Sequence, residues 1–180
     1  MKGIVFCEFL EFVAQRFGDD MVDDVIEDCA LASGGAYTAV GTYDPAEMVA
    51  LCRALAARTE RSVDALLQLF GGHLSESFAR GYPGFFTRSV NFFDFLESIE
   101  AYIHVEVRKL YPDAELPTFT VQERSARRLV MDYRSPRRLA ALAQGLIEGE
   151  APRFGVSARV RREPLAGPDG ETVRFTVEID

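Results

Sequence analysis

The stretch Tyr102-Ile-His-Val-Glu-Val-Arg-Lys-Leu-Tyr-Pro-Asp-Ala-Glu-Leu-Pro117 decides the fold, because it sets one of only two histidines in a helical pattern. Apolar residues recur before and through it at intervals of three and four, which predicts a single helix over residues 90–110. The apolar stripe consists of Phe92, Leu96, Ile99, Ile103, Val107 and Leu110. His104 lies beside this stripe, so its imidazole should face a packed interior. Pro112 ends the helix.

His104 has two interpretations. A single histidine on an apolar helix face is usually a hydrogen-bonded core residue. The functional alternative is an axial ligand to haem iron, which needs a neutral imidazole in a mostly apolar pocket. The other histidine, His73, follows Gly71-Gly72 inside a predicted helix, and we expect it to have a surface or bridging role.

A second group of polar residues follows about thirty positions later, in Tyr133-Arg-Ser-Pro-Arg137. Tyr133 and Ser135 point the same way if they end a strand, because alternate strand residues share a face. Ser135 suits a helix N-cap and Pro136 the first helical turn. Two hydroxyls, a guanidinium and a helix N-terminus would then converge, which favours binding of a carboxylate or phosphate.

Together, these residues resemble the haem nitric oxide/oxygen-binding family, the domain that also forms the haem sensor of soluble guanylate cyclase. The motifs that carry the resemblance are Met1-Lys2-Gly3, the His104 segment ending in Leu110-Tyr111-Pro112, the Tyr133/Ser135/Arg137 triplet and Gly145-Leu146-Ile147-Glu148-Gly149. The resemblance covers essentially the whole chain. It implies that His104 is the proximal ligand to the iron of haem b. It also implies that the triplet binds the haem propionates, and that Pro117 packs against the porphyrin.

The resemblance further implies a gas-binding pocket. Oxygen-binding members of the family carry a distal tyrosine five residues after the motif arginine, and Leu142 stands at that position here. The apolar residues that we place against the haem are Val5, Phe9, Leu74, Phe78, Leu142 and Leu146. None of them can donate a hydrogen bond to bound dioxygen. We therefore expect a gas sensor, and no enzyme, that binds nitric oxide and carbon monoxide at ferrous haem and excludes dioxygen.

Other functions stay open. A haem peroxidase or nitric oxide dioxygenase would need a distal acid–base group or stable dioxygen binding, and only His73 could supply the former. A dioxygen-binding sensor and a haem-free interaction module are further alternatives. In bacterial relatives the partner is commonly a separate histidine kinase or cyclic-di-GMP enzyme, and the resemblance implies the same partner class here.

Composition restricts these functions further. The chain has 180 residues, is 48% hydrophobic and carries a formal charge of −8, which argues against a nucleic-acid partner. No apolar run approaches the roughly 18 residues of a membrane span. The amphipathic N-terminus does not read as a signal peptide, so we expect a cytoplasmic protein. Cys7, Cys29 and Cys52 are too widely spaced for structural zinc and should be small buried hydrophobes.

The order of elements predicts an α+β fold in a single domain over residues 1–180. A helical subdomain of about residues 1–60 should precede a haem-ligating subdomain of about 61–180, with the haem buried between them. We expect helices at residues 3–17, 19–31, 45–57, 62–80, 90–110 and 136–148, and a short one within 81–86. The strands of a four-stranded antiparallel sheet are expected at residues 119–123, 127–133, 155–163 and 171–179, with a turn at 167–170.

Overall fold

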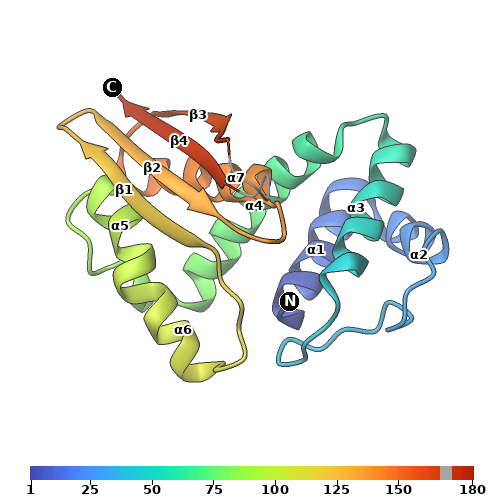
Figure 1. Ribbon diagram of the computed structural model, residues 1–180. Helices are drawn as coiled ribbons and strands as arrows, with labels where there is room; N and C mark the ends of the chain where they lie inside the picture. Colours follow the sequence, from blue (N-terminus) through green and yellow to red (C-terminus); the bar gives the residue numbers. More distant parts are fainter. Residues whose placement is uncertain (167–171) are drawn as a thin grey trace. The chain divides into compact units, whose positions relative to one another are not determined.

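The computed structural model describes residues 1–166 and 172–180 (Figure 1). The chain forms two compact units, Met1–Phe70 and Gly71–Asp180, and each has its own apolar core. The turn predicted at residues 167–170 lies outside the described part. No helix in the described part is both long and apolar enough to cross a membrane.

The first unit is helical. It contains α1 (Gly3–Phe17), α2 (Asp19–Glu27), α3 (Pro45–Thr59) and the first turns of α4 (Val63–Gly81). Aromatic rings hold α1 to α4, since the ring centroid of Phe70 lies 5.2 Å from Phe9 and 5.6 Å from Phe12. The other large members of this core are Phe6, Val13, Val25, Met48, Leu51, Leu55 and Leu66.

The predicted helix starts of this unit are confirmed. The Asp44 carboxylate accepts a hydrogen bond from the Ala46 N–H at 2.8 Å. The Ser62 hydroxyl accepts one from the Ala65 N–H at 3.1 Å. The predicted end of the second helix at residue 31 was wrong, because α2 ends at Glu27. The last turn of α2 carries no basic residue to stabilise the exposed carbonyl groups, so the helix ends earlier than its apolar pattern predicted.

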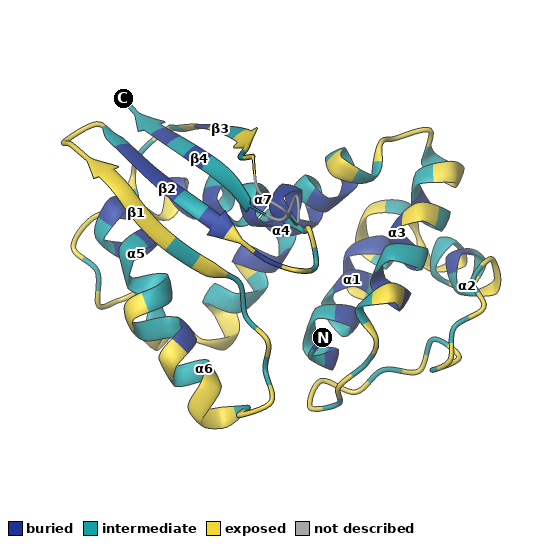
Figure 2. Ribbon diagram, in the orientation of Figure 1, coloured by how far each residue is buried: buried dark blue, intermediate teal, exposed yellow. Residues whose placement is uncertain are grey.

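The second unit is built on a four-stranded antiparallel sheet, as predicted. Its strands are β1 (Thr118–Arg124), β2 (Arg128–Arg134), β3 (Ala158–Pro164) and β4 (Thr172–Ile179), in the order β1-β2-β4-β3. Figure 2 shows the pattern of burial across it, with β2 largely buried and the edge strand β1 largely exposed. The predicted α+β class is therefore confirmed.

Two helices, α5 (Phe92–Ser98) and α7 (Ala140–Glu150), share one core with the sheet. This core contains Phe92, Phe93, Phe95, Leu96, Leu129, Met131, Tyr133, Ala140, Ala143, Ile147, Ala151, Val160, Phe175 and Val177. Burying a large apolar side chain contributes about 1.5–3 kcal/mol, so this core fixes α5 and α7 to the sheet. The segments that follow α5 and precede α7 contain the predicted iron ligand His104 and the predicted propionate-binding residues Tyr133, Ser135 and Arg137.

The helix predicted over residues 90–110 is irregular. It begins at Phe92, widens to a π-helix over Ile99–Ile103 and continues as α6 (His104–Leu110). The His104 N–H bonds the Ile99 carbonyl, five residues back. One extra residue per turn rotates the following face by about 100°. His104 is buried, as predicted, whereas Leu110, which was predicted to be apolar core, is 65% exposed.

The helix predicted at residues 136–148 begins and ends later than expected. Arg138 has a positive φ of 53°, which a right-handed helix excludes, so α7 starts at Ala140. Ser135 and Pro136 thus lie in a turn rather than at a helix N-terminus. Gly149, expected to end the helix, lies inside it. The chain leaves the helical path only at Gly155, whose φ is 70°.

Glycines let α4 and α7 approach closely within the second unit. A Cβ on Gly71 would lie 2.4 Å from the Leu142 carbonyl oxygen, and one on Gly149 would lie 2.9 Å from the Ser75 Cβ. The neighbour that comes close at Gly71 is the backbone of α7.

A buried carboxylate lies at this helix contact and makes stability depend on pH. Glu150 accepts hydrogen bonds from the Ser75 hydroxyl at 2.5 Å and from the Arg153 Nε at 3.1 Å. Burial raises the pKa of Glu150 above its ordinary 4.5, although Ser75 and Arg153 act in the opposite direction. A raised folded-state pKa means that ionisation costs stability, and the cost appears as the pH rises from the ordinary value through the raised one.

We expect Glu150→Gln to remove this dependence. Its free energy of unfolding, measured by urea titration at a series of pH values, should improve relative to the unmodified protein as the pH rises from about 4.5 to neutral. Ser75→Ala keeps Glu150 but removes a hydrogen-bond donor to its ionised form. The free energy of unfolding of this variant should therefore depend on pH more strongly than that of the unmodified protein. A constant difference between the Glu150→Gln variant and the unmodified protein across this range would contradict the assignment.

Candidate functional site

His104 begins α6, immediately after the π-helical turn. Only 8% of its surface is exposed, and its Nδ1 lies 3.0 Å from the Glu100 Oε2. Burial lowers the pKa of His104 below 6.5, while the hydrogen bond and charge of Glu100 act against this shift and Arg108 adds to it. The imidazole is thus kept neutral, as a metal ligand must be. When Nδ1 carries the proton, the Nε2 lone pair is the one available to a metal.

Glu100 is itself held in place. The same Oε2 accepts a hydrogen bond from the Phe119 N–H at 3.3 Å, and Oε1 lies 3.6 Å from a terminal nitrogen of Arg108. The Glu100 carboxylate therefore joins the π-helical turn to the first residues of β1. Glu100 was not predicted as a site residue, although its position four residues before His104 was a usable signal.

Ring contacts connect His104 with the second predicted group. The Phe119 ring centroid lies 6.1 Å from that of His104 and 5.3 Å from that of Tyr133. Phe119 is half-buried at the start of β1, and Tyr133 is buried at the end of the neighbouring β2. The structure therefore brings the predicted iron ligand and the predicted propionate-binding tyrosine into one region of the second unit.

Tyr133, Ser135 and Arg137 lie where β2 runs into the turn before α7. Ser135 is 4% exposed, and its hydroxyl accepts a hydrogen bond from the Arg137 N–H at 3.3 Å. Burial raises the pKa of the Tyr133 hydroxyl, and its hydrogen bond to Ser135 and the charge of Arg137 oppose that shift. Two hydroxyls and a cation converge as predicted, but a tight turn replaces the expected helix N-terminus.

Arg137 fits an anionic ligand. Its terminal nitrogens donate to the Glu115 carbonyl oxygen at 2.6 Å and to the Glu115 Oε2 at 2.9 Å. Its Nε is buried and has no hydrogen-bond partner among residues 1–166 and 172–180. A buried charged donor without a partner costs roughly 1–3 kcal/mol, so a carboxylate at this place would be stabilising. A haem propionate supplies such a carboxylate.

The donor set agrees with haem rather than with a bare metal ion. Within the described part of the chain, no three side chains of the His, Cys, Asp and Glu types form a metal-binding group. A lone imidazole holds iron well when a porphyrin supplies the other four nitrogens. The residues present therefore fit a haem with His104 as its protein ligand.

The other predicted haem contacts have different surroundings. Pro117 is half-buried and directly precedes β1. In the second unit, Leu74 and Leu142 are buried, whereas Phe78 and Leu146 are half-buried. In the first unit, Phe9 is fully buried in the core and Val5 is half-buried on α1. Their contact with haem stays a prediction.

His73 is half-buried on α4, and the described geometry gives it no role at iron. Cys52 is buried, as expected, and burial raises the pKa of its thiol to about 12. Cys7 and Cys29 are only half-buried, so the expectation of three buried cysteines was wrong for these two. Cys7 lies on α1, and Cys29 lies just after α2.

Comparison with known families shows which family the chain belongs to. The model of the haem-NO-binding family, HNOB, matches residues 2–162. The chain belongs to the HNOB, or H-NOX, family. Its members are haem-based gas sensors, and they bind haem and gaseous ligands.

Solved H-NOX structures agree with this assignment. The unliganded Fe(II) H-NOX protein from K. algicida is 42% identical, with a TM-score of 0.94 over 100% of this chain and 97% of that one. The Fe(II)CO H-NOX from Shewanella woodyi is 35% identical, with a TM-score of 0.82 over 99% and 94%. The Fe(II)NO H-NOX from S. oneidensis is 25% identical, with a TM-score of 0.90 over 100% and 99%. A comparison with curated proteins gives no match.

Proposed function

We propose that this H-NOX protein is a nitric oxide sensor that binds haem b through His104. The observation that carries the proposal is the buried His104 imidazole, whose Nδ1 lies 3.0 Å from the Glu100 carboxylate. Tyr133, Ser135 and Arg137 would hold the propionates, because their hydroxyls and the buried Nε of Arg137 provide donors to carboxylates. Haem, when bound, supplies an iron whose sixth position accepts a diatomic gas.

Gas selectivity would come from an apolar distal side. Tight dioxygen binding to haem is helped by a hydroxyl or amide donor, whereas nitric oxide and carbon monoxide bind without one. Leu142, at the family's tyrosine position, offers no donor, and Leu74 and Leu146 offer none either. A hydrogen bond contributes about 1 kcal/mol net, and more in a dry site. Its absence should lower dioxygen affinity tenfold or more, since about 1.4 kcal/mol corresponds to one decade.

The visible spectrum of the ferrous protein tests this proposal. Under argon it should be that of five-coordinate haem, it should stay so in air-saturated buffer for at least seconds, and it should change at once with nitric oxide or carbon monoxide. Leu142→Tyr should increase dioxygen affinity, because the ring adds the missing donor. Leu142→Phe is the matched control, since it adds a ring without a hydroxyl. A stable dioxygen spectrum in the unmodified protein would contradict the selectivity, and His73 would then be the first donor to test.

The sensor would signal to a separate partner protein. We propose a histidine kinase or a cyclic-di-GMP enzyme, as the family resemblance suggests. The cytoplasmic location, and the placing of the haem-ligating subdomain after about residue 60, remain predictions from the sequence.

A peroxide turnover assay separates the sensor from the alternative of a haem peroxidase, since the sensor should not turn over peroxide.

A further inference from the structure

The carboxylate of Glu100 has a geometry suited to controlling His104. Glu100 lies in the π-helical turn Ile99–Ile103, one helical turn before the histidine, and its Oε2 is 3.0 Å from the His104 Nδ1. An ionised carboxylate only accepts hydrogen bonds, so this contact requires the imidazole proton to sit on Nδ1. The tautomer with its lone pair on Nε2 is thereby selected.

Glu100 is not free to swing away from His104. The Phe119 N–H donates to the same Oε2 at 3.3 Å, and Arg108 lies 3.6 Å from the other oxygen. The Glu100 side chain is one-third exposed, whereas that of His104 is 10% exposed. The carboxylate therefore lies at the edge of the core, with a backbone donor from β1 and a cation from α6 fixing its direction.

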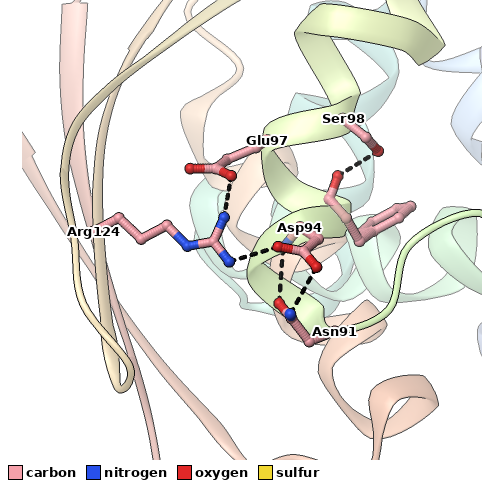
Figure 3. A network of polar contacts seen from close by, with 6 residues as sticks. Asn91, Asp94, Glu97, Ser98 and Arg124 are labelled. Atoms are coloured by element: carbon pink, nitrogen blue, oxygen red, sulfur yellow. Dashed lines mark hydrogen bonds and ion pairs between the residues drawn. The ribbon is translucent and has the colours of Figure 1, made fainter.

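The helix that carries Glu100 is also fixed to the sheet. Figure 3 shows Arg124, at the end of β1, reaching both Asp94 and Glu97 of α5. The Asn91 side-chain amide donates a hydrogen bond to the Asp94 carboxylate at 2.7 Å, and its carbonyl oxygen accepts one from the Asp94 N–H, which caps α5. Together with the contact from Glu100 to Phe119, this network attaches α5 and the π-helical turn to β1 at two separate places.

We propose that Glu100 is a positioning residue that fixes the tautomer and ring orientation of His104 and strengthens His104 as a ligand to haem iron. A carboxylate that accepts the second ring proton of a ligating histidine makes the other nitrogen a better donor. The strength of the proximal bond in this chain is then set by a carboxylate that is tied to β1 through Phe119. This inference rests on haem binding at His104, as proposed above.

Glu100→Gln tests the role with little change in shape. The resonance Raman iron–histidine stretching band of the ferrous protein should move to lower frequency, because a neutral amide accepts more weakly than a carboxylate. Glu100→Ala should move it further and raise the haem dissociation rate by about 10–100-fold. The matched control is Glu106→Gln, which removes one charge from the same helix, where Glu106 bonds Lys109 at 2.6 Å. Its band should stay where it is in the unmodified protein.

The Glu100 variants could lose haem altogether, so a second measurement uses the unmodified protein. In the diamagnetic ferrous carbon monoxide form with isotope-labelled imidazole, the His104 Nδ1 proton should be visible and exchange slowly with water. An equal Raman band in Glu100→Gln and Glu106→Gln, or a His104 ring without a proton on Nδ1, would overturn the role of Glu100. Purified protein with no Soret band would instead overturn the proposed haem site itself.

Discussion

His104→Gly should yield a folded protein that no longer retains haem. The reason is that His104 is the one protein side chain expected to bond the iron, and its loss leaves only propionate and apolar contacts. Added imidazole should restore haem binding, because the removed ring leaves a space of its own shape beside Phe119 and Glu100. Haem content per protein, measured by pyridine haemochrome absorbance, is the readout. We expect a near-complete loss without imidazole and a substantial recovery with it.

His73→Gly is the matched control, because it makes the same change at the second histidine of the chain. It should cost about 1 kcal/mol of helix stability and leave the haem content and ferrous spectrum unchanged. Retention of haem with an unaltered ferrous spectrum in His104→Gly would refute the ligand assignment. Loss of haem in the His73 variant alone would move that assignment to α4.

Arg137→Ala should accelerate haem dissociation about a hundredfold. Each charge-assisted hydrogen bond contributes roughly 1.5–3 kcal/mol, and the guanidinium can make at least two to a propionate. The buried Nε, which lacks a hydrogen-bond partner in the described part of the chain, marks where one of them would form. Haem transfer to an excess of acceptor globin measures the rate directly.

Two controls separate propionate binding from structural effects. Arg159→Ala removes an exposed guanidinium from β3, at the opposite edge of the sheet from β1, and should leave the rate unchanged. Glu115→Ala removes the carboxylate that bonds Arg137 at 2.9 Å, and it should not mimic Arg137→Ala. If it did, Arg137 would act by holding the segment before β1 rather than by binding haem.

Local signals were sufficient for most of the fold. Asp44-Pro45 and Ser62 predicted helix starts that the structure confirms, because capping depends on atoms within three residues. The alternating stretches at residues 119–123 and 127–133 predicted a hairpin, and β1 and β2 do pair antiparallel, because a connection of a few residues can join neighbouring strands only in that sense. The family resemblance, resting on His104 and the Tyr133/Ser135/Arg137 triplet, predicted the family that the comparison shows.

Errors came where geometry depends on neighbours distant in the sequence. The turn at Arg138, with its positive φ, moved the start of α7 away from Ser135, and no residue type at that position signals it. Gly149 looked like a helix end, since glycine often ends helices. It lies inside α7 because α4 passes so close that a Cβ would meet Ser75.

By itself, the sequence determined that a histidine stands in an amphipathic helix, that a polar triplet follows a strand, and that the chain is α+β. Only the tertiary structure decided which way the residues after the histidine face and what orients its Glu100 partner. An ideal helix would have directed Leu110 inward, but the π-helical turn at Ile99–Ile103 adds one residue and rotates the later face by about 100°. His104 is buried, as its pattern predicted, and it lies against Glu100, whose carboxylate is oriented by the Phe119 N–H. The Phe119 N–H belongs to β1, and it reaches Glu100 only because the chain folds back after α6. Side-chain periodicity along one helix does not encode such a contact.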